Sequence, residues 1–386
     1  MKRIVRFLSS FRLAVTIVVL LGVITWLGTL AQIELGLFRA QKMYFESFLV
    51  LHPIPLGSTT LIRLPLPGGY LLMAALFVNL VVGGIVRLRW TLSRIGILIT
   101  HAGVLMMLAG GFVTYVYTRD GHLTLREHEA SNLVRSYQDW ELVITPAPDE
   151  NGEAEAVVVP GDVFVPLAGT ERTATIRSDR LPFTLVLSRI VPNTWVAPAP
   201  QPLRGLAAEG FRLNPLEIHS EAEQNRLGAM ARLIPTGGGE ATEGVLVGGV
   251  PYPWGVEVDG RRYGITIQRR TWELPFTVVL DHTERDLHPG TMMAASFASE
   301  ITKVQGSDER KVRISMNEPL RHEGITLFQS GWRQDEMTME RESTFAVVQN
   351  PADSVPLWSC IVIGLGMTVH FSVRLRRHIL RQGARS

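Results

Sequence analysis

The sequence is poor in cysteine, because Cys360 is the only one among its 386 residues. A single cysteine excludes an intrachain disulfide, a Cys-x-x-Cys redox pair and the Cys-x-x-Cys-His motif of a c-type cytochrome. Any thiol chemistry that the function requires must therefore come from another protein. Cys360 itself lies in an apolar run, where a small packing role is typical.

The sequence also lacks several motifs of self-contained enzymes. It has no Gly-x-Ser-x-Gly, no phosphate-binding loop and no zinc-protease helix, which argues against an autonomous hydrolase or an ATP-driven pump. Acidic residues are absent from the three basic segments 1–12, 87–94 and 374–386. These segments are short and adjoin apolar runs, so they do not indicate nucleic-acid binding.

Four long uncharged runs are present instead, and each is close to the roughly 20 residues of a membrane-spanning helix. Pro65 and Pro67 place the start of the second helix near Gly68 or Gly69. We expect the first three helices at about 13–31, 69–88 and 95–117, within a membrane region 1–118. The runs are Leu13 to Ala31, Leu64 to Val86, Ile95 to Thr118 and Ser354 to Val373.

The basic segments predict the orientation of these helices. Lys and Arg gather on the cytoplasmic side of membrane proteins, and all three segments share one side if every run spans. Residues 119–353 then face outward, with 23 Lys and Arg against 34 Asp and Glu, a difference of −11. We therefore expect a multi-pass protein of the cytoplasmic (inner) membrane, with 354–386 forming the last helix and a basic cytoplasmic tail. A cleaved signal peptide is the alternative for the first run, although that run is longer than usual for one.

The outward region 119–353 reads as β-structure. Short runs rich in β-branched residues alternate with Pro, Gly, Asn and Asp, which predicts an all-β domain, either a sandwich or barrel-like. One helix could lie between Leu216 and Leu233. The string Leu181-Pro-Phe-Thr recurs as Leu274-Pro-Phe-Thr, which indicates either two related β-units or chance similarity between strands.

Apart from His101, no side chain between Ile95 and Thr118 is formally charged or strongly basic. An ionisable residue at membrane depth is costly and marks a candidate functional site, and imidazole is a common metal ligand. The plain alternative is a histidine that hydrogen-bonds a neighbouring helix. His370 lies at a similar depth in the last run, four residues before Arg374. The two rings could bind one haem iron from both faces, or they could be unrelated.

Several strings carry a resemblance to a known family. They are Gly28-Thr-Leu-Ala-Gln32, Arg94-Ile-Gly-Ile-Leu-Ile-Thr-His101-Ala-Gly103, His288-Pro-Gly-Thr291, Phe297-Ala-Ser299 and Met316-Asn-Glu-Pro-Leu-Arg-His-Glu-Gly324 continuing through Thr326-Leu-Phe-Gln-Ser-Gly331. In these strings, and in the order of three spans, an outward domain and a last span, the chain resembles the ResB (CcsB) family of system II cytochrome c biogenesis. The string that begins at Met316 is the longest and most specific of the matches.

The resemblance implies partners and a role. A ResB-like subunit acts with a Trp-rich ResC (CcsA)-like membrane subunit, and this chain has no such Trp-rich segment. The complex is expected to carry haem b across the membrane as a transient substrate and to attach it to the thiols of an apocytochrome c. A thioredoxin-like protein would keep those thiols reduced. His101 resembles the family's membrane histidine, whereas His370 matches no family motif and remains a weaker haem-ligand hypothesis.

Two other functions stay open. The chain could be a non-catalytic scaffold or apocytochrome chaperone that never touches haem. It could also be an unrelated transporter or sensor with an outward ligand-binding β-domain. If the chain is instead the ResB-like subunit, any haem-lyase activity belongs to the complex, and this chain is a non-autonomous subunit. The Asn317 to Gly331 string could be a strand–turn–strand core or a docking surface.

Overall fold

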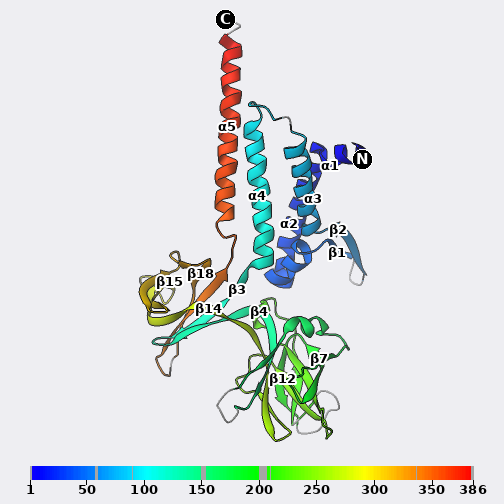
Figure 1. Ribbon diagram of the computed structural model, residues 1–386, viewed down its shortest axis with the longest axis vertical. Helices are drawn as coiled ribbons and strands as arrows, with labels where there is room; N and C mark the ends of the chain where they lie inside the picture. Colours follow the sequence, from blue (N-terminus) through cyan, green and yellow to red (C-terminus); the bar gives the residue numbers. More distant parts are fainter. Residues whose placement is uncertain are drawn as a thin grey trace. The chain divides into compact units, whose positions relative to one another are not determined.

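The computed structural model describes residues 2–56, 60–88, 90–148, 154–199, 207–208, 210–335 and 337–383 (Figure 1). Its contacts divide the chain into two units, Met1–Thr118 with Gln349–Ser386, and Arg119–Val348. The first unit is mainly helical and the second consists mainly of strands.

The first unit contains the long apolar helices. Its helices are α1 (Lys2–Leu8), α2 (Phe11–Ala40), α3 (Gly69–Asn79), α4 (Ile95–Tyr117) and α5 (Val355–Gly383), with π-helical segments at Gln41–Phe45 and Leu80–Val86. Within the described residues, four segments are long and apolar enough to cross a membrane: Phe11–Phe45, Gly69–Val86, Ile95–Tyr117 and Val355–Gln382. The four predicted apolar helices are therefore present. The first continues beyond Ala31, the end expected from the apolar run.

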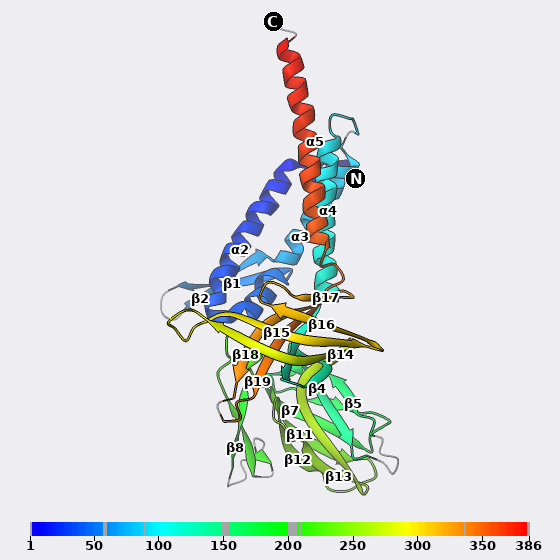
Figure 2. The same cartoon turned by 90° about the vertical axis from the view of Figure 1, so that its left-hand side faces the viewer.

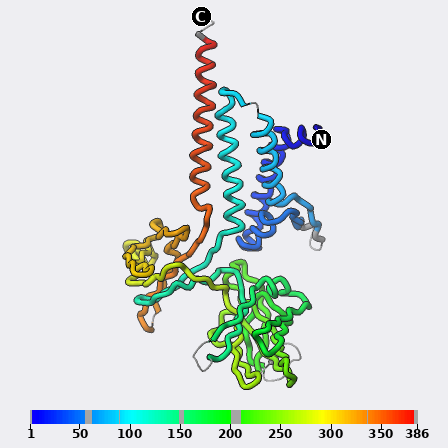
Figure 3. The backbone as a smooth tube through the Cα atoms, viewed as in Figure 1, coloured from blue at the N-terminus to red at the C-terminus, as the bar shows by residue number. Residues whose placement is uncertain are grey.

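Glycines bring α4 and α5 close together, and the two helices run side by side (Figure 3). A Cβ atom on Gly96 would lie 2.5 Å from the backbone nitrogen of His370. A Cβ atom on Gly103 would lie 2.7 Å from Cγ1 of Ile363, and one on Gly110 would meet the side chain of Val355. Glycine at these three positions lets the helix backbones approach, as small residues do in membrane helix pairs.

The end of α2 folds back on itself. Gly36 has φ 74° and ψ 166°, which is not helical, and it breaks the helix before Gln41–Phe45. A Cβ atom on Gly28 would lie 2.9 Å from the ring of Phe45, so the returning segment packs against α2 itself. It leads into the hairpin of β1 (Leu49–Leu56) and β2 (Thr60–Pro67), which the sequence analysis did not predict.

The described residues of the second unit form seventeen strands, which are arranged in open sheets (Figure 2). They are β3 (Arg119–Arg126), β4 (Ala130–Pro146), β5 (Val157–Pro160), β6 (Ala174–Ile176), β7 (Phe183–Val191), β8 (Thr194–Pro198), β9 (Ala207–Ala208), β10 (Phe211–Pro215), β11 (Gly228–Pro235), β12 (Thr242–Val247), β13 (Trp254–Val258), β14 (Arg261–Leu287), β15 (Ala294–Gln305), β16 (Asp308–Ser315), β17 (Leu320–His322), β18 (Ile325–Gln334) and β19 (Arg341–Gln349).

The β-rich prediction for this region is confirmed, but the barrel alternative is not supported. The largest sheet has the order β16-β15-β14-β4-β3-β19-β18-β17, and a second has the order β12-β11-β7-β6; over the described strands neither closes on itself. The helix considered between Leu216 and Leu233 is wrong. That segment holds one 3₁₀ turn, Ala222–Gln224, and then enters β11, because its apolar residues pair with β7 and β12.

Two large hydrophobic cores lie in the described part of this unit, beside a smaller cluster around Leu213, Met230 and Val247. One lies between β6, β7, β11 and β12 and the part of the large sheet formed by β4, β13 and β14. The other gathers side chains from β3, β15, β16, β18 and β19 with the remaining part of β14. The two repeated strings divide between the cores, since Phe183 is buried in the first and Phe276 in the second. Whether the two β-structures that carry the repeated strings are related stays a hypothesis.

Candidate functional site

His101 lies on α4 against the π-helical segment Leu80–Val86. Its Nδ1 atom is 3.3 Å from the carbonyl oxygen of Gly84. A Cβ atom on Gly84 would lie 2.7 Å from that Nδ1 and 3.0 Å from the ring carbon Cγ. The imidazole therefore occupies space that only a glycine leaves open.

This contact assigns the donor role in the ring to one nitrogen. A carbonyl oxygen only accepts, so the hydrogen bond requires Nδ1 to carry the proton and donate it to Gly84. In this tautomer the lone pair lies on Nε2, and no hydrogen bond to Nε2 occurs within the described part of the chain. Histidines that bind metals are commonly held in this way, with the second nitrogen donating to a backbone carbonyl.

The plain alternative for His101, a hydrogen bond to a neighbouring segment, is thus realised at one nitrogen only. It accounts for Nδ1 and leaves Nε2 able to bind a metal. Sequence reasoning did not identify Gly84 as part of this site. The pair Gly83-Gly84 inside an apolar run was the available signal, because glycine in a helix interior costs stability without a packing reason.

His370 lies on α5 in a different setting. Its backbone contacts Gly96 of α4, and its ring lies beside Phe371 with centroids 5.5 Å apart. The Nδ1 atom of His370 is buried and has no hydrogen-bond partner among the described residues.

The structure does not bring the two rings together. The α4 residues that meet α5, Gly96, Gly103 and Gly110, recur every seven residues and share one face. His101 follows Gly96 by five positions, which at 3.6 residues per turn places it about 140° away around the helix. His101 therefore faces the π-helical segment, and this arrangement provides no support for one iron held between both rings. Each histidine separately stays a predicted ligand.

In the second unit, His122 of β3 is the histidine whose proton affinity the fold changes most clearly. Burial lowers the pKa of His122, and the cations of Arg135 and Arg269 lower it further. Its ring lies beside Tyr137, with centroids 5.1 Å apart, and its Nδ1 has no partner among the described residues. Burial also raises the pKa of the Asp120 carboxyl, with a smaller contribution from Asp139. The lowered pKa favours the neutral form of His122 at the start of the β-rich unit.

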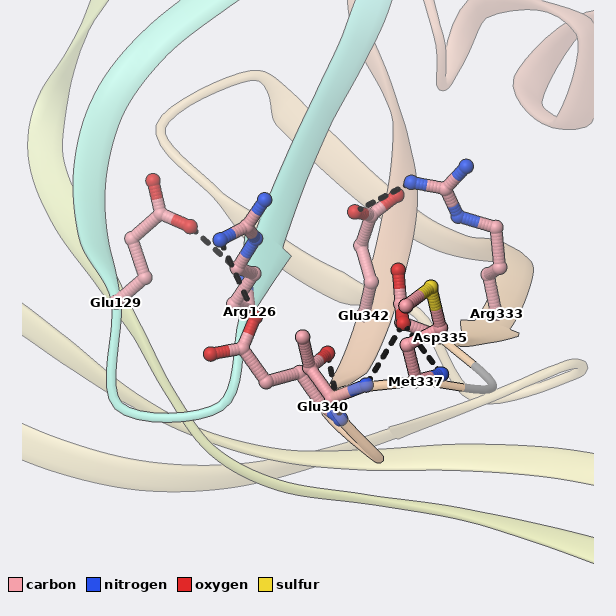
Figure 4. A network of polar contacts seen from close by, with 8 residues as sticks. Arg126, Glu129, Arg333, Asp335, Met337, Glu340 and Glu342 are labelled. Atoms are coloured by element: carbon pink, nitrogen blue, oxygen red, sulfur yellow. Dashed lines mark hydrogen bonds and ion pairs between the residues drawn. The ribbon is translucent and has the colours of Figure 1, made fainter.

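A surface network of polar contacts lies where β18 ends and β19 begins, as Figure 4 shows. Arg126 contacts Glu340 at 3.2 Å, and Arg333 contacts Glu342 at 3.1 Å. Backbone N–H donors of Thr338 and Met337 lower the pKa of Asp335, whose carboxylate caps this turn. Exposed pairs of this kind contribute little free energy, so the network defines the turn rather than a binding site.

The Asn317 to Gly331 string forms a strand–turn–strand core, as its Pro and Gly predict. β17 pairs with β18 across a turn at Glu323 and Gly324, both of which have positive φ. Gln329 donates from Nε2 to the carbonyl oxygen of Gly331 at 2.9 Å and to Oγ of Ser343 at 2.8 Å. Its Oε1 accepts from Ser299 at 2.8 Å, so the buried amide is fully used in holding β15, β18 and β19 together.

Four helices capable of spanning a membrane and a β-rich unit make this chain a candidate multi-pass membrane protein. The model of the ResB-like family matches residues 254–344, which confirms the resemblance to that family. The match covers β13 to β18 and enters β19, and it includes the strings at His288, Phe297 and Met316. It does not include His101 or His370. The comparison with curated proteins finds no match.

Proposed function

We propose that this chain is the ResB-like subunit of a cytochrome c synthase, which takes part in moving haem across the membrane and in attaching it to apocytochrome c. The family match supports a role in cytochrome c biogenesis. The observation that carries the finer proposal is the geometry of His101, whose Nδ1 is engaged by Gly84 while Nε2 is left for iron.

The residues around His101 fit haem as a substrate. Haem is planar and mostly apolar, so an imidazole on an apolar helix can hold the iron while lipid and aliphatic side chains shield the ring. α4 carries no formally charged side chain between Ile95 and Tyr117. The protein's contribution is the axial nitrogen and its orientation, which also tunes the iron's redox behaviour.

The covalent step would use groups from other molecules. Thioether formation adds a thiol S–H across a haem vinyl group, with sulfur bonding one carbon and the proton going to the other. The only cysteine here, Cys360, lies on α5, so the thiols would be those of the apocytochrome. We propose a ResC-like membrane subunit as the partner for haem delivery and a thioredoxin-like protein as the reductant of the apocytochrome thiols.

The proposed location is the cytoplasmic (inner) membrane, with Arg119–Val348 on the outward side. The support is the positive-inside rule applied to the segments 1–12, 87–94 and 374–386, which contain no Asp or Glu. An outward β-unit is also where an apocytochrome would be met.

A gene deletion tests this function. We expect the deleted strain to lose covalent haem from its c-type cytochromes, as detected by haem staining of denatured proteins, and the wild-type gene to restore it. Normal covalent haem in the deleted strain would contradict the proposal and favour an unrelated transporter or sensor.

A scaffold without haem is the second candidate, and one observation favours it. The family match lies entirely within the β-rich unit and leaves both membrane histidines outside. Under this alternative, a His101→Ala variant would complement the deletion fully. Under the first proposal it would not.

A further inference from the structure

The hairpin β1–β2 is apolar almost throughout. Between Leu49 and Pro67 the sequence contains a single charged residue, Arg63. Large apolar side chains on both strands are exposed: Leu49, Leu51, Ile54, Ile62 and Leu64. An exposed apolar surface of this kind marks an interaction site.

Both faces of the hairpin are apolar. Packing of one face against the helices therefore does not account for its apolar side chains. Leu49 and Leu51 share one face, since side chains alternate along a strand, and Val50 lies on the other. Val50 is buried in the core formed with α2 and α3. Ile54 and Ile62, which pair across the strands on that second face, are 36% and 47% exposed. Only the base of the hairpin is covered, and a two-stranded ribbon is marginally stable in water without such cover.

The helices place this hairpin at membrane depth. Phe45, four residues before β1, packs on Gly28, which lies inside the apolar candidate span Phe11–Phe45. Gly69, two residues after β2, begins α3 in contact with the same Phe45. Both ends of the hairpin therefore leave the helices at the level of Gly28, and the strands project sideways from α2 and α3 (Figures 1 and 2).

The edges of the hairpin suit a medium without water. Cross-strand pairs of the hairpin alternate between two kinds, and Pro53, Pro65 and Pro67 all fall in pairs of one kind. These pairs are Leu49 with Pro67, Leu51 with Pro65 and Pro53 with Arg63. Proline has no N–H, so these pairs must be the non-hydrogen-bonded ones, whose backbone groups point to the outer edges. Three outer-edge donors are thereby removed, which lowers the cost of burial in lipid and blocks the addition of a partner's strand.

Polar contacts hold the hairpin in this position. The hydroxyl of Tyr44, a buried residue of the π-helical segment, lies 2.6 Å from Nδ1 of His52 on β1. This pair joins the hairpin to the returning end of α2. The long side chain of Arg63 can extend its charge to the phosphate of a lipid headgroup while its methylene groups stay in the apolar layer.

We propose that the β1–β2 hairpin is a membrane anchor that lies in the boundary between headgroups and acyl chains, in the leaflet where α2 ends and α3 begins. Its occupant is phospholipid, because the exposed side chains continue the apolar surface of the candidate spans on either side. The anchor fixes the end of the α2–α3 pair and does not depend on haem handling.

Nitroxide labels on single cysteines test the proposal in the full chain, reconstituted into vesicles of phosphatidylethanolamine and phosphatidylglycerol. The native Cys360, exposed on α5, provides a reference on a membrane helix. In a Cys360→Ser background, Leu51→Cys and Ile62→Cys report the two faces of the hairpin. Tyr252→Cys, at a residue 83% exposed in the β-rich unit, provides the aqueous reference.

The readout is the ratio of collision rates with oxygen, which partitions into lipid, and with a water-soluble nickel chelate. We expect this ratio at Leu51→Cys and Ile62→Cys to be several-fold higher than at Tyr252→Cys and close to that at Cys360. A ratio equal to that at Tyr252→Cys would overturn the proposal. So would labels that are immobilised and shielded from both reagents, because a protein or a second copy of this chain would then cover the hairpin.

Discussion

Gly84 leaves the space in which the imidazole of His101 lies, because a Cβ atom on Gly84 would come within 2.7 Å of Nδ1. The same glycine provides the carbonyl oxygen that accepts the proton of Nδ1. One residue thus sets both the position of the ring and which nitrogen is left for the proposed iron ligation.

A Gly84→Ala substitution should therefore weaken haem binding while leaving His101 in the sequence. The added methyl group forces the ring away from its carbonyl acceptor, and loss of such supporting contacts typically lowers metal affinity by about 10–100-fold. Absorbance titration of the purified protein with haem measures the change. Gly111→Ala on α4, where a Cβ meets nothing within 4 Å, is the matched control. Equal haem affinity in both variants would contradict the role given to Gly84.

The close contact of α4 and α5 should be sensitive to one methyl group. In Gly96→Ala the new Cβ would lie 2.5 Å from the backbone nitrogen of His370 and 2.6 Å from the carbonyl oxygen of Gly366. Overpacking of this kind costs about 1–3 kcal/mol, so we expect a lower free energy of unfolding in detergent micelles. Gly364→Ala on α5, which meets nothing within 4 Å, should unfold like the wild type. An unchanged stability in Gly96→Ala would show that these helices do not pack as described.

The hydrogen bonds of the buried Gln329 amide should contribute more to the stability of the β-rich unit than the volume of the side chain does. Gln329→Leu removes its bonds to Ser299, Ser343 and the carbonyl oxygen of Gly331. Each buried polar group left without a partner costs about 1–3 kcal/mol, so chemical denaturation should begin at a lower denaturant concentration. Gln334→Leu, a half-buried position at the end of the same strand with one hydrogen bond to the carbonyl oxygen of Met339, is the control. If the two variants unfold alike, the network contributes nothing to the stability of this unit.

Mild acid should destabilise the β-rich unit through His122. Burial lowers the folded-state pKa of His122 below its usual 6.5, so the unfolded chain takes up the proton first as the pH falls. Stability is then lost from just above pH 6.5 downward until the folded pKa is passed. A His122→Gln variant should lose less stability than the wild type between pH 7.5 and 5. Identical pH profiles would contradict the neutral, buried state of His122.

The raised pKa of Asp120 acts in the opposite direction. Because the folded state binds this proton more readily than the unfolded chain, its contribution to stability grows as the pH falls towards 3.8. The difference between wild type and His122→Gln separates the two effects, since Asp120 is present in both proteins.

Apolar runs were sufficient to predict α3, α4 and α5, because a spanning helix is defined by local composition. The hairpin was missed since the run from Leu64 to Val86 joined β2 to α3 without a change in hydropathy. Thr60–Pro67 is a strand through its pairing with Leu49–Leu56, and the prolines in both segments weaken the strand signal in the sequence.

In the second unit, too, part of the fold was predictable from the sequence and part was not. Short β-branched runs predicted strands, but the single long strand β14 contains Pro275 and reads as two separate runs in the sequence, Tyr263-Gly-Ile-Thr-Ile267 and Phe276-Thr-Val-Val-Leu280. Its continuity depends on β4 and β15, which hydrogen-bond to different parts of it. The site was half predictable. His101 stands out as a basic side chain in an apolar run, whereas the pair Gly83-Gly84 is a sequence signal that does not show which residue it meets.

The haem content of the purified complex most directly tests the central claim, that His101 is an iron ligand. The complex of this chain with its proposed membrane partner would be isolated as wild type, His101→Ala and His101→Gly, and bound haem measured by the absorbance of its pyridine adduct. We predict loss of most haem in both variants and partial recovery in His101→Gly when free imidazole fills the vacated position. Equal haem in all three proteins, with no response to imidazole, would contradict the assignment of His101 as an iron ligand.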